Sequence, residues 1–164
     1  MPDSTPPDGA TGPTPILLLG VGNLLVGDEG VGVHAVRALE TESWPAHVTL
    51  LDGGTGGFQL LEYFQSFRRI ILIDATRDGA PAGTVRLFRA RGPQDCPPAL
   101  GAHDLGLRDL LSAAALLGGW GELQVVTVAI EELRPMCLEL SPPVAAALAE
   151  VRVQVRRLVE APEA

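Results

Sequence analysis

Short apolar runs that alternate with helix-like segments constrain the fold of this chain more than any other feature. The run 16–20 (ILLLG) is continuously apolar, which is typical of a strand buried on both faces. The β-branched run 68–75 (RRIILIDA) and the run 122–130 (ELQVVTVAI) also predict strands. The runs 47–52 (HVTLLD) and 83–90 (GTVRLFRA) predict two further strands, and the alternation in the second is typical of a sheet edge. The pattern predicts a single three-layer α/β domain, in which a mostly parallel, twisted, five-stranded sheet carries helices on both faces.

Four segments between and after these strands have the spacing or composition of helices. They are 29–42, 58–67, 103–118 and 141–160. The last helix is expected to begin with Ser141 as its N-cap and prolines in its first turn. Residues 1–14 (MPDSTPPDGATGPT) contain almost no apolar side chains and predict a disordered N-terminal tail, which leaves 15–161 as the single folded domain.

The charged residues and the cysteines exclude several kinds of site. All 12 basic residues are arginines, so a P-loop lysine, a Schiff-base lysine and a Ser–Lys dyad are excluded. The net charge of −8 argues against nucleic acid as a partner. No apolar run reaches the roughly 18 residues of a membrane span, so we expect a cytoplasmic protein with no membrane partner. Cys96 and Cys137 are far apart and form neither a disulfide framework nor a CxxC metal motif.

The stretch 20–36 (GVGNLLVGDEGVGVHAV) resembles a dinucleotide-binding loop but departs from it at two points. The third glycine of G-x-G-x-x-G is replaced by Leu25. Asp28 and Glu29 then stand near the start of the helix, where they would repel a pyrophosphate. Acids also favour a helix N-terminus through the helix dipole, which explains one of them without any ligand. We therefore expect no nucleotide cofactor.

Polar residues at the expected carboxyl ends of the strands suggest a different site. If the sheet is parallel, Glu29, Asp74 and His103 converge on one crevice, and two carboxylates with one imidazole suit a divalent first-row metal. Structural roles are also open: Asp74 caps the loop that follows its strand, or His103 belongs to the N-cap region of the next helix. Sequence spacing alone does not choose between these interpretations.

Four blocks of sequence resemble the hydrogenase maturation endopeptidases. They are 20–32 (GVGNLLVGDEGVG), 51–57 (LDGGTGG), 73–75 (IDA) and 103–107 (HDLGL). The resemblance implies a twisted, mostly parallel five-stranded sheet. It also implies an endopeptidase that removes a C-terminal extension from the precursor of the nickel-iron hydrogenase large subunit, after nickel insertion.

The same resemblance assigns roles to individual residues. It makes Glu29, Asp74 and His103 both the catalytic and the metal-contacting residues, and the metal is the nickel of the precursor or another divalent ion in that site. The glycine loop 53–57 is expected to line the substrate cleft, with Asn23 and Asp52 as supporting residues.

The chemistry of cleavage is left open by the sequence. Either a metal polarises the scissile carbonyl or its bound water, or a carboxylate such as Asp28 or Asp74 activates water, as in an aspartyl-type endopeptidase. The partner is expected to be the hydrogenase large-subunit precursor, contacted by the variable loop 93–100, and the protein is expected to be a monomer. The alternatives are a non-catalytic chaperone that checks the metal and a nucleotide-binding module.

Overall fold

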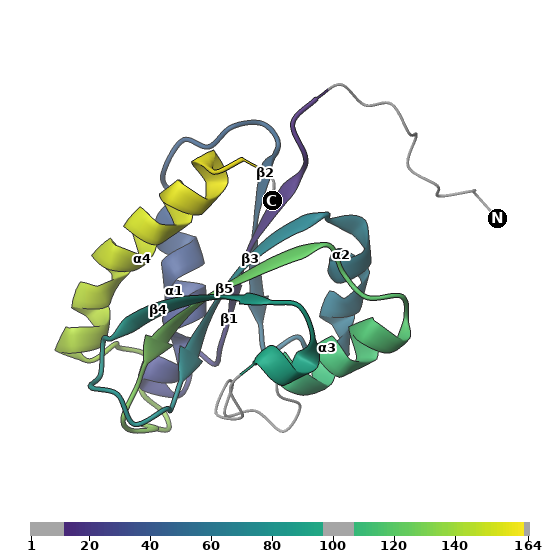
Figure 1. Ribbon diagram of the computed structural model, residues 1–164. Coiled ribbons are helices and arrows are strands. Elements are labelled where there is room, and N and C mark those ends of the chain that lie inside the picture. The colour runs from purple at the N-terminus through teal and green to yellow at the C-terminus, as the bar shows by residue number, and fades with distance from the viewer. Residues whose placement is uncertain (1–11, 97–106, 163–164) are drawn as a thin grey trace.

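A five-stranded sheet forms the centre of the molecule (Figure 1). The computed structural model describes residues 12–96 and 107–162. The strands are β1 (Ile16–Val21), β2 (Val48–Gly54), β3 (Arg69–Thr76), β4 (Val85–Ala90) and β5 (Glu122–Ala129). They lie in the order β2-β1-β3-β5-β4, and only β4 runs antiparallel to its neighbour. The predicted mostly parallel α/β sheet with an edge strand at 83–90 is confirmed.

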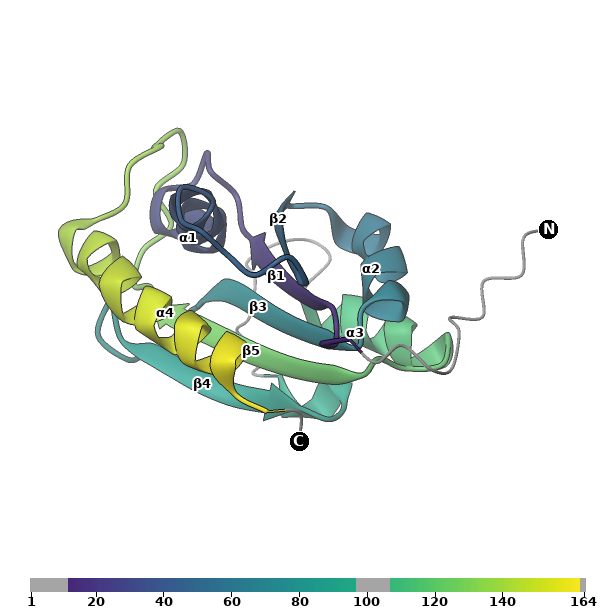
Figure 2. The ribbon, with the colours of Figure 1, turned by 90° about the horizontal axis from the view of Figure 1, so that it is seen from above.

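Helices cover both faces of the sheet (Figure 2). The helices are α1 (Val31–Leu39), α2 (Leu61–Ser66), α3 (Leu107–Leu116) and α4 (Pro142–Glu160), with three short 3-10 helices, η1 (Gly27–Gly30), η2 (Gly57–Leu60) and η3 (Pro93–Asp95). α1 and α4 pack on one face, while α2 and α3 pack on the other. Within the described part of the chain, no helix has the length and apolar character needed to cross a bilayer.

Alternating side chains of the central strands divide the core into two halves. In β1, Leu17 and Leu19 point toward α2 and α3, whereas Ile16 and Leu18 point toward α1 and α4. All four are at most 1% exposed. Burial on both faces explains why this strand reads as a continuous apolar run rather than an alternating one.

Two of the predicted helices differ from the observed ones at their starts. The segment 29–42 begins with η1 and becomes α-helical only at Val31, and 58–67 likewise divides into η2 and α2. α4 begins after Ser141 as predicted, but the Ser141 side chain makes no capping hydrogen bond. Its hydroxyl donates to Asp28 instead, across 113 positions of sequence.

The amino edge of the sheet is closed by a buried arginine. Arg69, at the start of β3, lies 3.3 Å from Glu122 and donates to the carbonyl of Leu158 at 2.9 Å. A cation beside the last carbonyls of a helix complements the helix dipole, so Arg69 fastens the end of α4 to the sheet.

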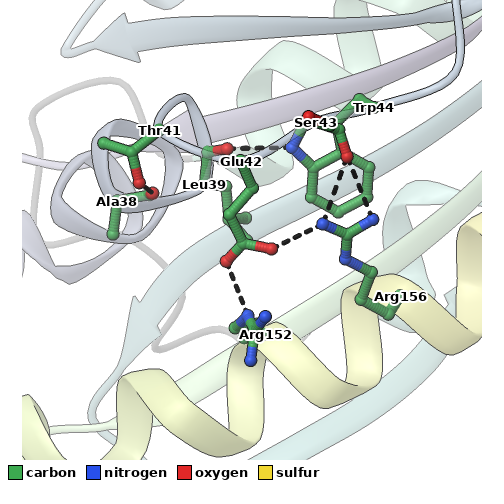
Figure 3. A network of polar contacts seen from close by, with 8 residues as sticks. All are labelled: Ala38, Leu39, Thr41, Glu42, Ser43, Trp44, Arg152 and Arg156. Atoms are coloured by element: carbon green, nitrogen blue, oxygen red, sulfur yellow. Dashed lines mark hydrogen bonds and ion pairs between the residues drawn. The ribbon is translucent and has the colours of Figure 1, made fainter.

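A polar network joins the end of α1 to α4 (Figure 3). The Glu42 carboxylate forms ion pairs with Arg156 at 2.5 Å and with Arg152 at 2.6 Å. The Arg156 guanidinium also stacks 3.8 Å from the Trp44 ring centroid, and the Trp44 indole donates to the Leu39 carbonyl at 2.8 Å. The hydrogen bonds from Arg156, followed by those from Arg152, hold the pKa of Glu42 below its usual value.

Candidate active site at the carboxyl edge of the sheet

The order of the strands places a topological switch point between the carboxyl ends of β1 and β3. The chain leaves β1 for β2 on one side and then returns to β3 on the other side of β1. In open parallel sheets, this reversal is the point where ligands bind. The loop after β1 and the end of β3 therefore supply the side chains of the candidate site.

Two glycines of the 20–32 block, Gly20 and Gly32, are required for close packing. A Cβ on Gly32 would lie 2.2 Å from the carbonyl oxygen of Ile73 and 2.3 Å from that of Val21. A Cβ on Gly20 would lie 2.1 Å from the carbonyl oxygen of Gly32. The start of α1 thus presses directly against β1 and β3.

Glu29 is held by the loop that follows β1. It lies in η1 and is 2% exposed, and one of its carboxylate oxygens accepts a hydrogen bond from the backbone N–H of Asn23 at 3.1 Å. The Asn23 side chain in turn accepts from the Leu25 N–H at 2.9 Å, which shapes the loop. Because η1 contacts β3, this arrangement carries Glu29 to the strand that bears Asp74.

Asp74 is a buried carboxylate on the face covered by α2 and α3. Ile70 and Leu72 of the same strand point to this face, and Asp74 is the next residue in that alternation. It is 1% exposed and accepts a hydrogen bond from the Ala75 N–H at 2.8 Å. On β5 its register partner is Thr127, which is also buried.

The pKa of Cys96, on the same face of the sheet, is shifted by burial and by nearby charges. Burial, followed by the negative charge of Asp95, raises the pKa of Cys96 to about 11, and Asp74 contributes in the same direction. Arg108 at the start of α3 opposes the shift. Cys96 is therefore a neutral, buried thiol at physiological pH.

His103, the third predicted site residue, lies outside the described residues. Its place in the chain is four positions before Leu107, where α3 begins on the face that Asp74 occupies. Over 12–96 and 107–162, no group of three or more His, Cys, Asp and Glu side chains forms a metal-binding cluster. The described part of the site thus offers two buried carboxylates, Glu29 and Asp74, which is an incomplete ligand set for a transition metal.

Asp28 has a structural role that the sequence did not indicate. It is 4% exposed, and its two oxygens accept hydrogen bonds from the backbone N–H of Ser141 at 2.6 Å and from the Ser141 hydroxyl at 2.7 Å. Arg134 lies 3.4 Å away. These bonds fasten η1 to the segment that leads into α4, so the Asp28 carboxylate is engaged in holding the fold.

Asp52 and the glycine loop 53–57 lie at the carboxyl end of β2, which β1 separates from β3. Arg37 of α1 forms an ion pair with Asp52 at 2.9 Å, and the Gly54 N–H donates to the same side chain at 3.0 Å. Asp52 therefore joins α1 to β2.

The fold and site together define a class: a mostly parallel α/β domain with two buried carboxylates, Glu29 and Asp74, beside the point where the strand order reverses between β1 and β3. Comparison with known proteins identifies the family. The model of the hydrogenase maturation protease family matches residues 33–157. The match begins four positions after Glu29. The chain belongs to the hydrogenase maturation protease family and is a peptidase, as the sequence blocks implied.

Individual relatives agree with this assignment. The chain is 38% identical over 153 residues to the hydrogenase expression/formation protein HoxM of Azotobacter vinelandii, covering 88% of this chain and 72% of that protein. It is 39% identical over 145 residues to the hydrogenase 2 maturation protease of Escherichia coli, covering 85% and 87%. The solved structure of the hydrogenase-maturating endopeptidase HybD from E. coli superposes with a TM-score of 0.75 at 37% identity, covering 88% of this chain and 93% of that one.

Proposed function

We propose that this peptidase removes the C-terminal extension of a nickel-iron hydrogenase large-subunit precursor once nickel has been inserted. The observation that carries the proposal is the placement of Glu29. This buried carboxylate sits in a 3-10 turn that contacts the strand carrying Asp74, directly before the point where Gly32 of α1 packs against that strand. Membership of the hydrogenase maturation protease family supplies the class of partner.

In this proposal, the site recognises the precursor by its nickel. Glu29 and Asp74 contact it from the two sides of the strand reversal, and His103 is assigned as the third contact from its sequence block alone. Carboxylate and imidazole groups are suitable ligands for a divalent first-row ion, so another such ion in the same place would meet the same groups. A precursor without metal brings no cation to these carboxylates, so we expect it to dock less well.

Hydrolysis requires a group that accepts a proton from water. Asp28 is a poor candidate because both of its oxygens accept hydrogen bonds from Ser141. We assign this role to Asp74, whose carboxylate would take the proton as water adds to the scissile carbonyl and then deliver it to the departing amine. A divalent metal at the same site would, when bound, supply polarisation of that carbonyl.

The test is cleavage of the precursor followed by mass spectrometry. Nickel-loaded and nickel-free precursor are each incubated with the wild type, Glu29→Gln and the matched control Glu40→Gln, an exposed glutamate at the end of α1. The wild type and the Glu40→Gln control are expected to release a C-terminal peptide from the nickel-loaded precursor only. Glu29→Gln is expected to release none from either form. Cleavage of the nickel-free form would overturn the metal check. Failure of the wild type to cleave a loaded cognate precursor would overturn the endopeptidase function and favour the chaperone.

Three parts of the expected biology stay predictions. They are action in the cytoplasm, a monomeric state, and contact between the precursor and the loop 93–100, of which only 93–96 is described.

A further inference from the structure

Large apolar side chains are exposed on two loops beside the candidate site. Leu25 follows β1 and is 56% exposed, while Met136 and Leu138 lie between β5 and α4 and are 89% and 61% exposed. Contiguous exposed apolar surface on a protein of this size marks an interaction site more often than chance. We refer to residues 23–27 and 133–138 together as the apolar ridge.

The two loops of the apolar ridge are joined as a small piece of parallel sheet. Val26 and Cys137 form a β-bridge. The Gly27 N–H donates to the Cys137 carbonyl at 2.7 Å, and the Cys137 N–H donates to the Leu25 carbonyl at 3.2 Å. These bonds hold the neighbouring Met136 at φ 60°, a left-handed conformation that is unfavourable for a residue other than glycine. The exposed methionine is thus presented on a fixed backbone, which reduces the entropy lost when a partner binds.

The apolar ridge is continuous with η1, the 3-10 helix that carries Glu29. Arg134 lies 3.4 Å from Asp28 and donates to the Glu139 carbonyl at 2.9 Å. Residues 23–27 lead directly into η1, and the Asn23 N–H holds Glu29. A protein that brings its scissile bond to Glu29 therefore meets the apolar ridge at the same time.

The charge around the apolar ridge specifies the kind of partner. Glu131, Glu132 and Glu139 are exposed on the 131–141 segment, and the whole chain carries a net charge of −8. An apolar centre with an acidic rim is complementary to an apolar patch bordered by arginine or lysine.

We propose that the apolar ridge is a docking surface for the hydrogenase precursor, which presents to it an apolar patch edged by basic side chains. The inference rests on the proposed function, because that function names the partner. It goes further in assigning precursor affinity to residues that take no part in the chemistry.

The test compares two double variants that remove equal exposed apolar surface. Met136→Ser/Leu138→Ser alters the apolar ridge. Leu116→Ser/Leu117→Ser is the control, since those leucines are 89% and 59% exposed at the end of α3, next to the opposite edge of the sheet. Dissociation constants are measured on nickel-loaded and nickel-free precursor, and KM and kcat on the loaded form.

The expected result is a rise of about tenfold in Kd and KM for the ridge variant, with kcat and the control variant within twofold of wild type. Glu132→Gln/Glu139→Gln is expected to make association with the precursor less sensitive to salt. Equal affinity of the ridge variant, the control variant and the wild type would overturn the docking surface. So would a loss confined to kcat, or a wild-type dimer in sedimentation velocity that dissociates in the ridge variant.

The outcomes separate this inference from the proposed function. Wild-type cleavage with unchanged binding by the ridge variant rejects the docking surface alone. Weakened binding by the ridge variant, when even the wild type cleaves nothing, rejects the endopeptidase function and keeps the docking surface.

Discussion

Replacing Gly32 with alanine inserts a methyl group where two strands and a helix meet. The new Cβ would stand 2.2 Å from the Ile73 carbonyl oxygen and 2.3 Å from the Val21 carbonyl oxygen, whereas ordinary contacts begin at 3.4 Å. Since both obstacles are backbone atoms, α1 must move away from the sheet by about 1 Å. In an unobstructed helix, the same change would stabilise the protein by up to roughly 1 kcal/mol.

The expected net effect is destabilisation by about 2 kcal/mol, because overpacking of this kind costs about 1–3 kcal/mol and exceeds the gain in helix propensity. For a domain of this size, that corresponds to a fall in Tm of roughly 4–8 °C. Thermal unfolding by circular dichroism measures it. Movement of α1 also displaces η1, so cleavage of the loaded precursor should fall even at temperatures where the variant is folded.

Gly12→Ala is the control, because a Cβ there would meet nothing within 4 Å. A Gly32→Ala protein as stable as this control, with undiminished cleavage, would refute the argument that glycine contacts position Glu29.

Three further predictions concern the rest of the fold. Arg69→Met should destabilise the protein by about 3–5 kcal/mol in urea unfolding at pH 7, because it leaves Glu122 buried without its cation; an additional Glu122→Gln change should restore part of the loss, and no restoration would contradict this reason. The pKa of Glu42 is lowered in the folded state, so its contribution is present above the unfolded pKa of about 4.3 and is lost as pH falls through the folded pKa. The stability difference between wild type and Glu42→Gln should therefore be larger at pH 7 than at pH 3, and a difference independent of pH would argue against it. Cys137 is half-buried, whereas Cys96 is buried with its pKa raised to about 11, so iodoacetamide at pH 8 should modify Cys137 first by mass spectrometry. Equal rates for the two thiols in the folded protein would contradict that order.

Local patterns in the sequence are sufficient to predict the architecture. The runs around Leu18 and Ile71 are apolar at every position because their strands are buried on both faces, and strands of that kind occur in parallel sheets covered by helices. Parallel order then places Glu29 and Asp74 at the same edge of the sheet, which the structure bears out through the contact between η1 and β3. His103 stays a prediction from its sequence block.

Contacts between distant parts of the chain could not be predicted from the sequence. Asp28 has the same character as Glu29 in the sequence, and its hydrogen bonds to Ser141, 113 positions away, have no local signal that could have predicted them. The pairing of Val26 with Cys137, which creates the apolar ridge, likewise has no local signal.

The sequence by itself determined which segments become strands, where the acidic residues stand relative to them and, through four short blocks, the family. Only the tertiary structure decided which glycines allow a close approach of backbones, which carboxylate bonds to the segment before α4 and which apolar side chains stay exposed. The physical reason is that hydrophobic periodicity depends on near neighbours, whereas hydrogen-bond partners and close backbone approaches depend on which distant segments the fold brings together.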